Sequence, residues 1–198
     1  MKNKINQFNI VICGVGGQGL ITLTKILALS AQEEGYEVKT SELHGLAQRG
    51  GSVETHIRFG EKIYSPLIKQ GGADLIIALE AQEAIKASFY ASKKAGTLFL
   101  INKFLTPIIG QEIIPVEKVS KILNNFSKKT VIISATETTE KEFGNSVLAG
   151  TYLLGAAIYQ DLIPLKILSI LNAMQKVVPD KFFEINKKAF ELAGNLEK

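Results

Sequence analysis

The chain has 198 residues, of which 46% are hydrophobic and 21% charged, and its formal net charge is +4. This composition is typical of a globular protein with one full core, so we expect a single domain over residues 1–198. The mild, dispersed charge forms no basic stripe and argues against nucleic acid as a partner. The single cysteine, Cys13, excludes an internal disulfide and a cysteine-ligated zinc or iron–sulfur site within this chain.

The first informative stretch is FNIVICGVGGQGL, residues 8–20. A short apolar run ends in a glycine-rich turn, and an apolar helix pattern follows at once. Gly14, Gly16 and Gly19 fit the G-x-G-x-x-G pattern in the strand–turn–helix context that it requires. Glycines there allow a tight turn, and free N–H groups at the helix start face a phosphate. The pattern predicts a phosphate-bearing ligand; the alternative is a turn that only packs helix against strand.

The next elements continue an α/β pattern. Residues 20–34 form an amphipathic helix pattern that ends at Gly35, and residues 37–41 form a second short strand. These elements predict a βαβ opening with a right-handed crossover. Residues 52–59 then alternate between apolar and polar side chains, which predicts a half-exposed strand with His56 on the exposed face. We expect it to turn back into Ile63 and Tyr64, which gives an antiparallel excursion near residues 52–65.

The remaining patterns complete the expected fold. Strands are predicted at 75–79, 97–101 and 130–133, and helices at 80–92, 116–125, 145–160, 165–177 and 179–193. The result is a Rossmann-like α/β fold whose five to seven mostly parallel strands carry helices on both faces. The helix at 145–160 contains no charged residue and must be buried on most sides. Either a terminal helix layer or a subunit interface can bury it, so the sequence also allows a homodimer of the isolated chain.

A second motif, ELHGLAQRGG, follows the second strand. Glu42 lies 23 residues after Gly19, where dinucleotide-binding domains place the acid that binds a ribose. His44, Gln48 and Arg49 stand on a loop that leads to Gly50 and Gly51. Arg49 is expected to bind an anionic group or a carboxylate of a partner subunit, because little bulk shields it. The alternative is a structural loop in which Arg49 pairs with Glu42 or Glu80.

Residues with catalytic chemistry are scarce. His44 has no cysteine or aspartate near it in the sequence, so no triad is indicated. Cys13 is expected to be a small buried hydrophobe. Glu80 and Glu83 lie at a helix start, where negative charge is favoured in any case, and Glu80 remains a weaker site candidate. We therefore predict no catalytic residue and no metal ligand in this chain.

In combination, the segments GVGGQG, ELHGLAQRGGSV, SPLI and ADLIIALE are specific. They resemble the gamma-type domain of the 2-oxoacid:ferredoxin oxidoreductases, including the indolepyruvate beta subunits and the pyruvate, ketoisovalerate and 2-oxoglutarate gamma subunits. The resemblance runs from about residue 9 to residue 157. Its two loop motifs match these residues of the chain, which we expect to form the cofactor-binding side: Gly14, Gly16, Gly17, Gln18, Gly19, Glu42, His44, Gln48, Arg49, Gly50, Gly51 and Ser52.

This resemblance implies a subunit that does not work alone. The family oxidatively decarboxylates a 2-oxoacid to acyl-coenzyme A and passes the electrons to ferredoxin. Thiamine diphosphate and iron–sulfur clusters are implied for large partner subunits, and the isolated chain is expected to be inactive. The chain itself holds no cofactor firmly, although its loops are candidates for contact with the coenzyme A phosphates. The resemblance does not settle which 2-oxoacid is used.

Two other functions compete with this one. A free-standing NAD(P)-dependent oxidoreductase uses the same opening motif but needs a hydride-transfer site, and none stands out in the last third of the chain. A nucleotide-binding regulatory module without catalysis also fits the motifs. The segment MKNKINQFNI lacks a signal-peptide core, and no apolar run reaches membrane length, so we expect a cytoplasmic protein without membrane contact.

Overall fold

The computed structural model describes residues 5–45, 50–107 and 113–196. Its strands are β1 (Gln7–Val15), β2 (Glu37–His44), β3 (Ser52–Gly60), β4 (Leu75–Ala78), β5 (Leu98–Asn102) and β6 (Lys129–Ile133). They form a six-stranded sheet in the order β2-β3-β1-β4-β5-β6. The pairs β1–β4, β4–β5 and β5–β6 are parallel, whereas β3 is antiparallel to both β1 and β2. The predicted mostly parallel sheet, with its antiparallel exception, is confirmed.

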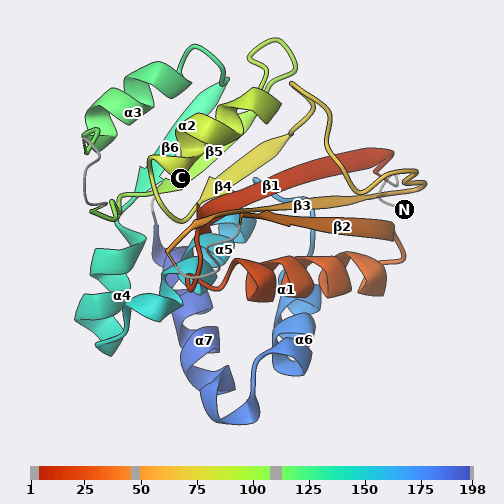
Figure 1. Cartoon of the computed structure of the whole chain (residues 1–198). Helices are drawn as coiled ribbons and strands as arrows, with labels where there is room; N and C mark the ends of the chain where they lie inside the picture. The colour runs from red at the N-terminus through yellow and green to blue at the C-terminus, as the bar shows by residue number, and fades with distance from the viewer. Residues whose placement is uncertain (1–4, 46–49, 108–112, 197–198) are drawn as a thin grey trace.

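Helices cover both faces of the sheet (Figure 1). They are α1 (Leu20–Glu33), α2 (Glu83–Ala87), α3 (Val116–Leu123), α4 (Ala135–Phe143), α5 (Ala149–Tyr159), α6 (Ile167–Val177) and α7 (Asp180–Leu192). The first core lies between the sheet and α1, α5, α6 and α7, and it includes Ile10 and Ile12 of β1. The second core lies under α2 and α3 and includes Val11 and Cys13. This alternation along β1 shows that its two faces are both buried, as its continuous apolar run predicts.

The expected βαβ opening is present, but its two strands are not neighbours. β1 and β2 run in the same direction, and β3 lies between them. Because β3 therefore has a partner on each side, no free edge remains for a strand that returns after it. The predicted strand at Ile63 and Tyr64 is wrong for this reason. Ile63 is instead buried in a loop, and its N–H donates to Glu37 Oε2 at 3.2 Å.

The structure differs from the expectations in three further places. His56 is buried, with 1% of its surface exposed, because the loop after β3 covers the polar face of that strand. Its Nδ1 accepts the N–H of Ile68 at 3.1 Å, so its Nε2 carries the proton and donates to Glu54 at 2.8 Å. The helix α4 was not expected, since its sequence ATETTEKEF is mostly polar and only Ala135 and Thr139 are buried. The helix predicted at 80–92 is shorter: α2 gives way to a 3₁₀ turn at Ser88–Tyr90.

The charge-free helix α5 is buried by the chain's own helices. Every residue from Ala149 to Ile158 is buried, and α7 and α4 pack on α5 together with the sheet (Figure 1). Gly155 lies directly beneath the end of α7. A Cβ atom added there would overlap the carbonyl of Phe190 and come within 2.9 Å of Ala193 Cβ. Glycine is thus required for the close approach of the two helices.

We expect Gly155→Ala to lower the free energy of unfolding by about 1–3 kcal/mol, because overpacking outweighs the better helix propensity of alanine. Urea unfolding followed by circular dichroism would measure this. Gly45→Ala is the matched control: no atom of the described residues lies within 4 Å of its added Cβ, so its effect should stay within about 0.5 kcal/mol. Equal stability of the two variants would contradict the packing argument.

Candidate functional site

The Gly-loop, residues 14–19, connects β1 to α1 as predicted. Gly17 and Gly19 have φ values of +103° and +81°, which side chains other than glycine rarely adopt. The N–H of Leu23 donates to Gly19 O at 3.1 Å as the first bond of the helix. The N–H groups of the three preceding helical residues therefore have no acceptor within the helix. Together with the helix dipole, they form a positive end that favours an anion.

A cavity of about 450 Å³ lies beside this positive end. Its walls come from the Gly-loop, α1, β2 and β3: Gly16, Gly17, Gly19, Leu20, Ile21, Glu42, His44 and Val53. Glu42 and His44 share the face of β2 that α1 covers, since their cross-strand partners are Thr55 and Val53. The structure thus brings three glycines of the first motif, Gly16, Gly17 and Gly19, and two polar residues of the second motif around one cavity.

The two sequence motifs also contact each other directly. The N–H of Gly16 donates to Gly51 O at 2.9 Å, and the N–H of Gly50 donates to Gly16 O at 3.3 Å. These bonds extend the β1–β3 pairing, whose last pair is Val15 with Ser52. The residues Gly50, Gly51 and Ser52, which we call the loop stem, are therefore held against the Gly-loop. Gln48 and Arg49, also predicted at the site, lie outside the described residues.

Gly14 and Gln18 shape the loop from behind. Gly14 is buried, and an added Cβ would lie 3.1 Å from the Cβ of Leu79. The side chain of Gln18 folds back, and its Oε1 accepts the N–H of Val15 at 2.9 Å. Neither residue lines the cavity beside Glu42. Their observed contacts fix the turn rather than face that cavity.

A second cavity of about 360 Å³ lies on the other side of the Gly-loop, at the carboxyl ends of β1, β4 and β5. Ligands of open α/β sheets bind at such edges. Apart from Gln18, sequence reasoning did not single out its polar side chains, although an asparagine that ends an apolar strand is a usable signal. Asn102 holds Thr136 through two hydrogen bonds, and Thr106 Oγ1 is buried without a partner among the described residues. The full lining is Val15, Gly16, Gly17, Gln18, Gly50, Leu79, Asn102, Phe104, Thr106, Thr136, Ser146, Val147 and Ala149.

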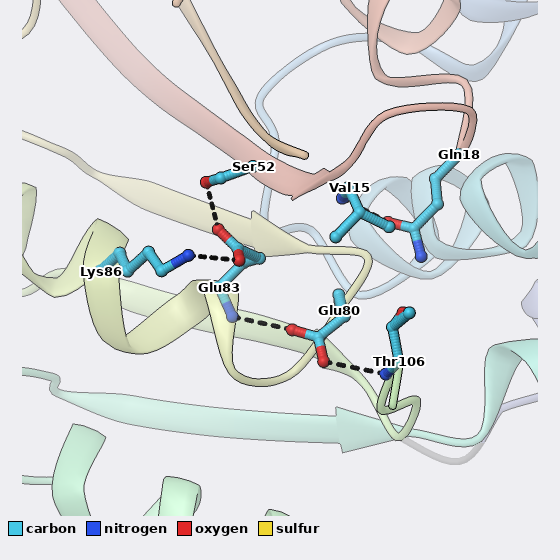
Figure 2. A network of polar contacts seen from close by, with 7 residues as sticks. All are labelled: Val15, Gln18, Ser52, Glu80, Glu83, Lys86 and Thr106. Carbon is cyan, nitrogen blue, oxygen red and sulfur yellow. Dashed lines mark hydrogen bonds and ion pairs between the residues drawn. The ribbon is translucent and has the colours of Figure 1, made fainter. Parts of the chain in front are cut away.

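Glu80, the weaker candidate, is buried beside Glu83 on the face of the sheet that carries α2 (Figure 2). Its two carboxylate oxygens accept the N–H groups of Glu83 at 2.9 Å and Thr106 at 3.2 Å. Burial raises the pKa of the Glu80 carboxyl, and the nearby Glu83 charge adds to this, while the accepted N–H groups lower it. The residue therefore holds backbone segments in place and does not face the cavity beside Glu42.

Cys13 is a buried residue of the core under α2, as predicted. Burial raises the pKa of its thiol well above the usual value, and the charges of Glu83, Glu54 and Glu80 raise it further. A thiol in this state is a poor nucleophile. In the part of the chain that the structure describes, no three acidic, histidine or cysteine side chains lie together so that they could hold a metal ion. None of the described helices is long and apolar enough to span a membrane.

The fold and the Gly-loop place the chain in the Rossmann-like class of α/β domains. The family model for pyruvate ferredoxin/flavodoxin oxidoreductase matches residues 9–196, and the chain belongs to this family. Indolepyruvate oxidoreductase subunit IorB of Thermococcus kodakarensis is 35% identical over 193 residues, which are 95% of each chain. The common gamma subunit of the pyruvate/ketoisovalerate oxidoreductases from the same organism is 26% identical over 92% of each chain.

A solved structure has the same fold. It is the 2-oxoglutarate:ferredoxin oxidoreductase from Magnetococcus marinus, with a TM-score of 0.72 and 17% identity. The match covers 95% of the present chain but 30% of that longer chain. The curated relatives are oxidoreductase subunits, so the family supports the subunit hypothesis over a free-standing NAD(P)-dependent enzyme or a regulatory module.

We expect the thiol of Cys13 to be unreactive in the native protein. Ellman's reagent at pH 8 should label less than about a tenth of the protein in an hour, because the thiol is both buried and protonated. Denaturation in guanidinium chloride should then release one thiol per chain, which serves as the control. Rapid native labelling would show that the core under α2 opens readily.

Proposed function

We propose that the chain is the small subunit of a 2-oxoacid:ferredoxin oxidoreductase whose substrate is indolepyruvate. The observation that supports this substrate is the contrast between 35% identity to an indolepyruvate oxidoreductase subunit and 26% to a pyruvate/ketoisovalerate gamma subunit. Both matches cover more than nine-tenths of the chain. In this assignment, partner subunits carry out the decarboxylation, and this chain has a binding and positioning role.

The chain's own chemistry supports such a division. Decarboxylation of a 2-oxoacid needs an electron sink, which thiamine diphosphate supplies when it is bound. The sequence has one cysteine, which is buried, so this chain cannot ligate an iron–sulfur cluster through several thiolates. We therefore assign thiamine diphosphate and the clusters to a larger partner that also delivers electrons to ferredoxin.

The cavity beside Glu42 is the part of the chain that we propose to contact coenzyme A. Free N–H groups at the start of α1 suit a phosphate, and the Glu42 carboxylate can accept a ribose hydroxyl. His44 lies on the same wall and its ring can add a hydrogen bond. The loop stem is hydrogen-bonded to Gly16, which lines this cavity.

We expect the isolated chain to show no indolepyruvate oxidation, even with thiamine diphosphate and coenzyme A added. Co-expression with its large partner should give a complex that reduces ferredoxin, or a viologen dye, when indolepyruvate is supplied. Pyruvate and 2-ketoisovalerate at equal concentration are the substrate controls. Turnover by the isolated chain would refute the division of labour, and a complex that prefers pyruvate would refute the assigned substrate.

A single charge at the cavity mouth would test the proposed phosphate contact. Ile21 lines the cavity and is 43% exposed, so a polar residue can replace it. Glutamate in the first helical turn suits the helix dipole but repels a phosphate. We expect Ile21→Glu to raise the KM for coenzyme A about fivefold over Ile21→Gln, as repulsion of about 1 kcal/mol predicts. Equal KM values for the two variants would place the phosphates elsewhere.

A further inference from the structure

Two buried carboxylates on the α2 face are not explained by the proposed binding site. Glu80 and Glu83 are 3% and 5% exposed. Removing carboxylates from water is costly, and such groups are retained only with good partners. Each has such partners, and two of them lie outside α2: Ser52 at the start of β3 and Thr106 on the loop after β5 (Figure 2).

Glu83 connects α2 to the loop stem. The hydroxyl of Ser52 donates to Glu83 Oε2 at 2.5 Å. The other oxygen, Oε1, accepts from Lys86 Nζ at 2.6 Å, so the carboxylate has an ion-pair partner as well as a hydroxyl partner. Ser52 is the first residue of β3 and the last one paired with β1, opposite Val15. The contact therefore anchors the stem at the point where it leaves the sheet.

Glu80 connects the same place to a different loop. It accepts the N–H of Glu83 with one oxygen and the N–H of Thr106 with the other. Thr106 lines the second cavity, and Gly50 of the loop stem also lines it. Two segments that border this cavity are thus tied to one pair of adjacent carboxylates. Figure 2 shows the connection from Ser52 through Glu83 and Glu80 to Thr106.

We propose that Glu83 is a positioning residue: through Ser52 it holds the loop stem against Gly16, which lines the cavity beside Glu42, and so sets the shape of that cavity from the opposite face of the sheet. The effect on turnover rests on the function proposed above, whereas the effect on the stem does not. Glu83 itself does not line the cavity where the phosphate and the ribose of coenzyme A are proposed to bind. Its action passes through Ser52 to the backbone bonds between Gly16 and the two stem glycines.

Hydrogen exchange of the isolated chain, measured by NMR, tests this directly. The N–H groups of Gly16 and Gly50 form the bonds between loop and stem. In Ser52→Ala and in Glu83→Ala we expect these two amides to exchange about tenfold faster, while amides in β1 and β4 keep their rates. The double variant should exchange no faster than the more affected single variant, because both changes break one connection.

Ser88→Ala is the matched control. It removes a hydroxyl next to α2 whose hydrogen bond, to Ile85 O at 2.6 Å, does not reach the loop stem. Its Gly16 and Gly50 amides should exchange at the parent rate. Unchanged exchange in a Ser52→Ala variant that melts like the parent would overturn the proposal, and so would an equal increase in Ser88→Ala.

Kinetics of the assembled complex provide the second readout. We expect Ser52→Ala to raise the KM for coenzyme A at least threefold and to change kcat less than twofold, because the stem holds Gly16, which lines the cavity proposed for coenzyme A, and contacts no reacting group. A kcat loss with constant KM would overturn the role at this site. If the parent complex does not turn over indolepyruvate, the proposed function fails, and the exchange rates still decide the role of Glu83.

Discussion

The antiparallel insertion of β3 between β1 and β2 is the constraint on which the site depends. Because β3 runs against β1, its first residue, Ser52, meets the last residue of β1, Val15. A parallel strand in the same place would begin at the opposite edge of the sheet. The reversal therefore brings the second sequence motif to the Gly-loop and allows the backbone bonds of Gly16 to the loop stem. It also leaves β2 at the outer edge, where Glu42 and His44 form one wall of the cavity.

The two faces of the sheet have different tasks at this edge. The face under α1 carries the cavity with the free N–H groups, so its chemistry is that of a positive helix end beside a strand with polar side chains. The face under α2 carries the buried carboxylates, whose partners are backbone N–H groups, a serine and a lysine. Polar groups that are fully partnered in a region of low dielectric constant are rigid, because breaking any one bond leaves a costly unpaired group. The face under α2 is therefore rigid, and it supports the cavity on the face under α1.

Local patterns in the sequence predicted the local features well. The Gly-loop, the position of β3 and the charge-free α5 each follow from spacing within a dozen residues, and each was found where expected. What failed depended on distant partners. The burial of His56 arises from Ile68 and Tyr90, which are packed against its ring, and neither is visible in the alternation of β3. The place of β3 between β1 and β2, and the contact of Ser52 with Glu83, likewise join residues far apart in sequence.

The edge position of β2 has a consequence for the order in which the site becomes structured. β1 is hydrogen-bonded on both sides and buried on both faces, whereas β2 pairs only with β3 and most of its residues are exposed. Local opening therefore requires less free energy in β2 than in β1. The Gly-loop wall of the cavity therefore follows the strand that opens less readily, and the wall with Glu42 and His44 belongs to the strand that opens more readily. A molecule that bridges the Gly-loop and Glu42 would therefore spend part of its binding free energy on ordering β2. Its binding would in turn make local opening of that strand less frequent.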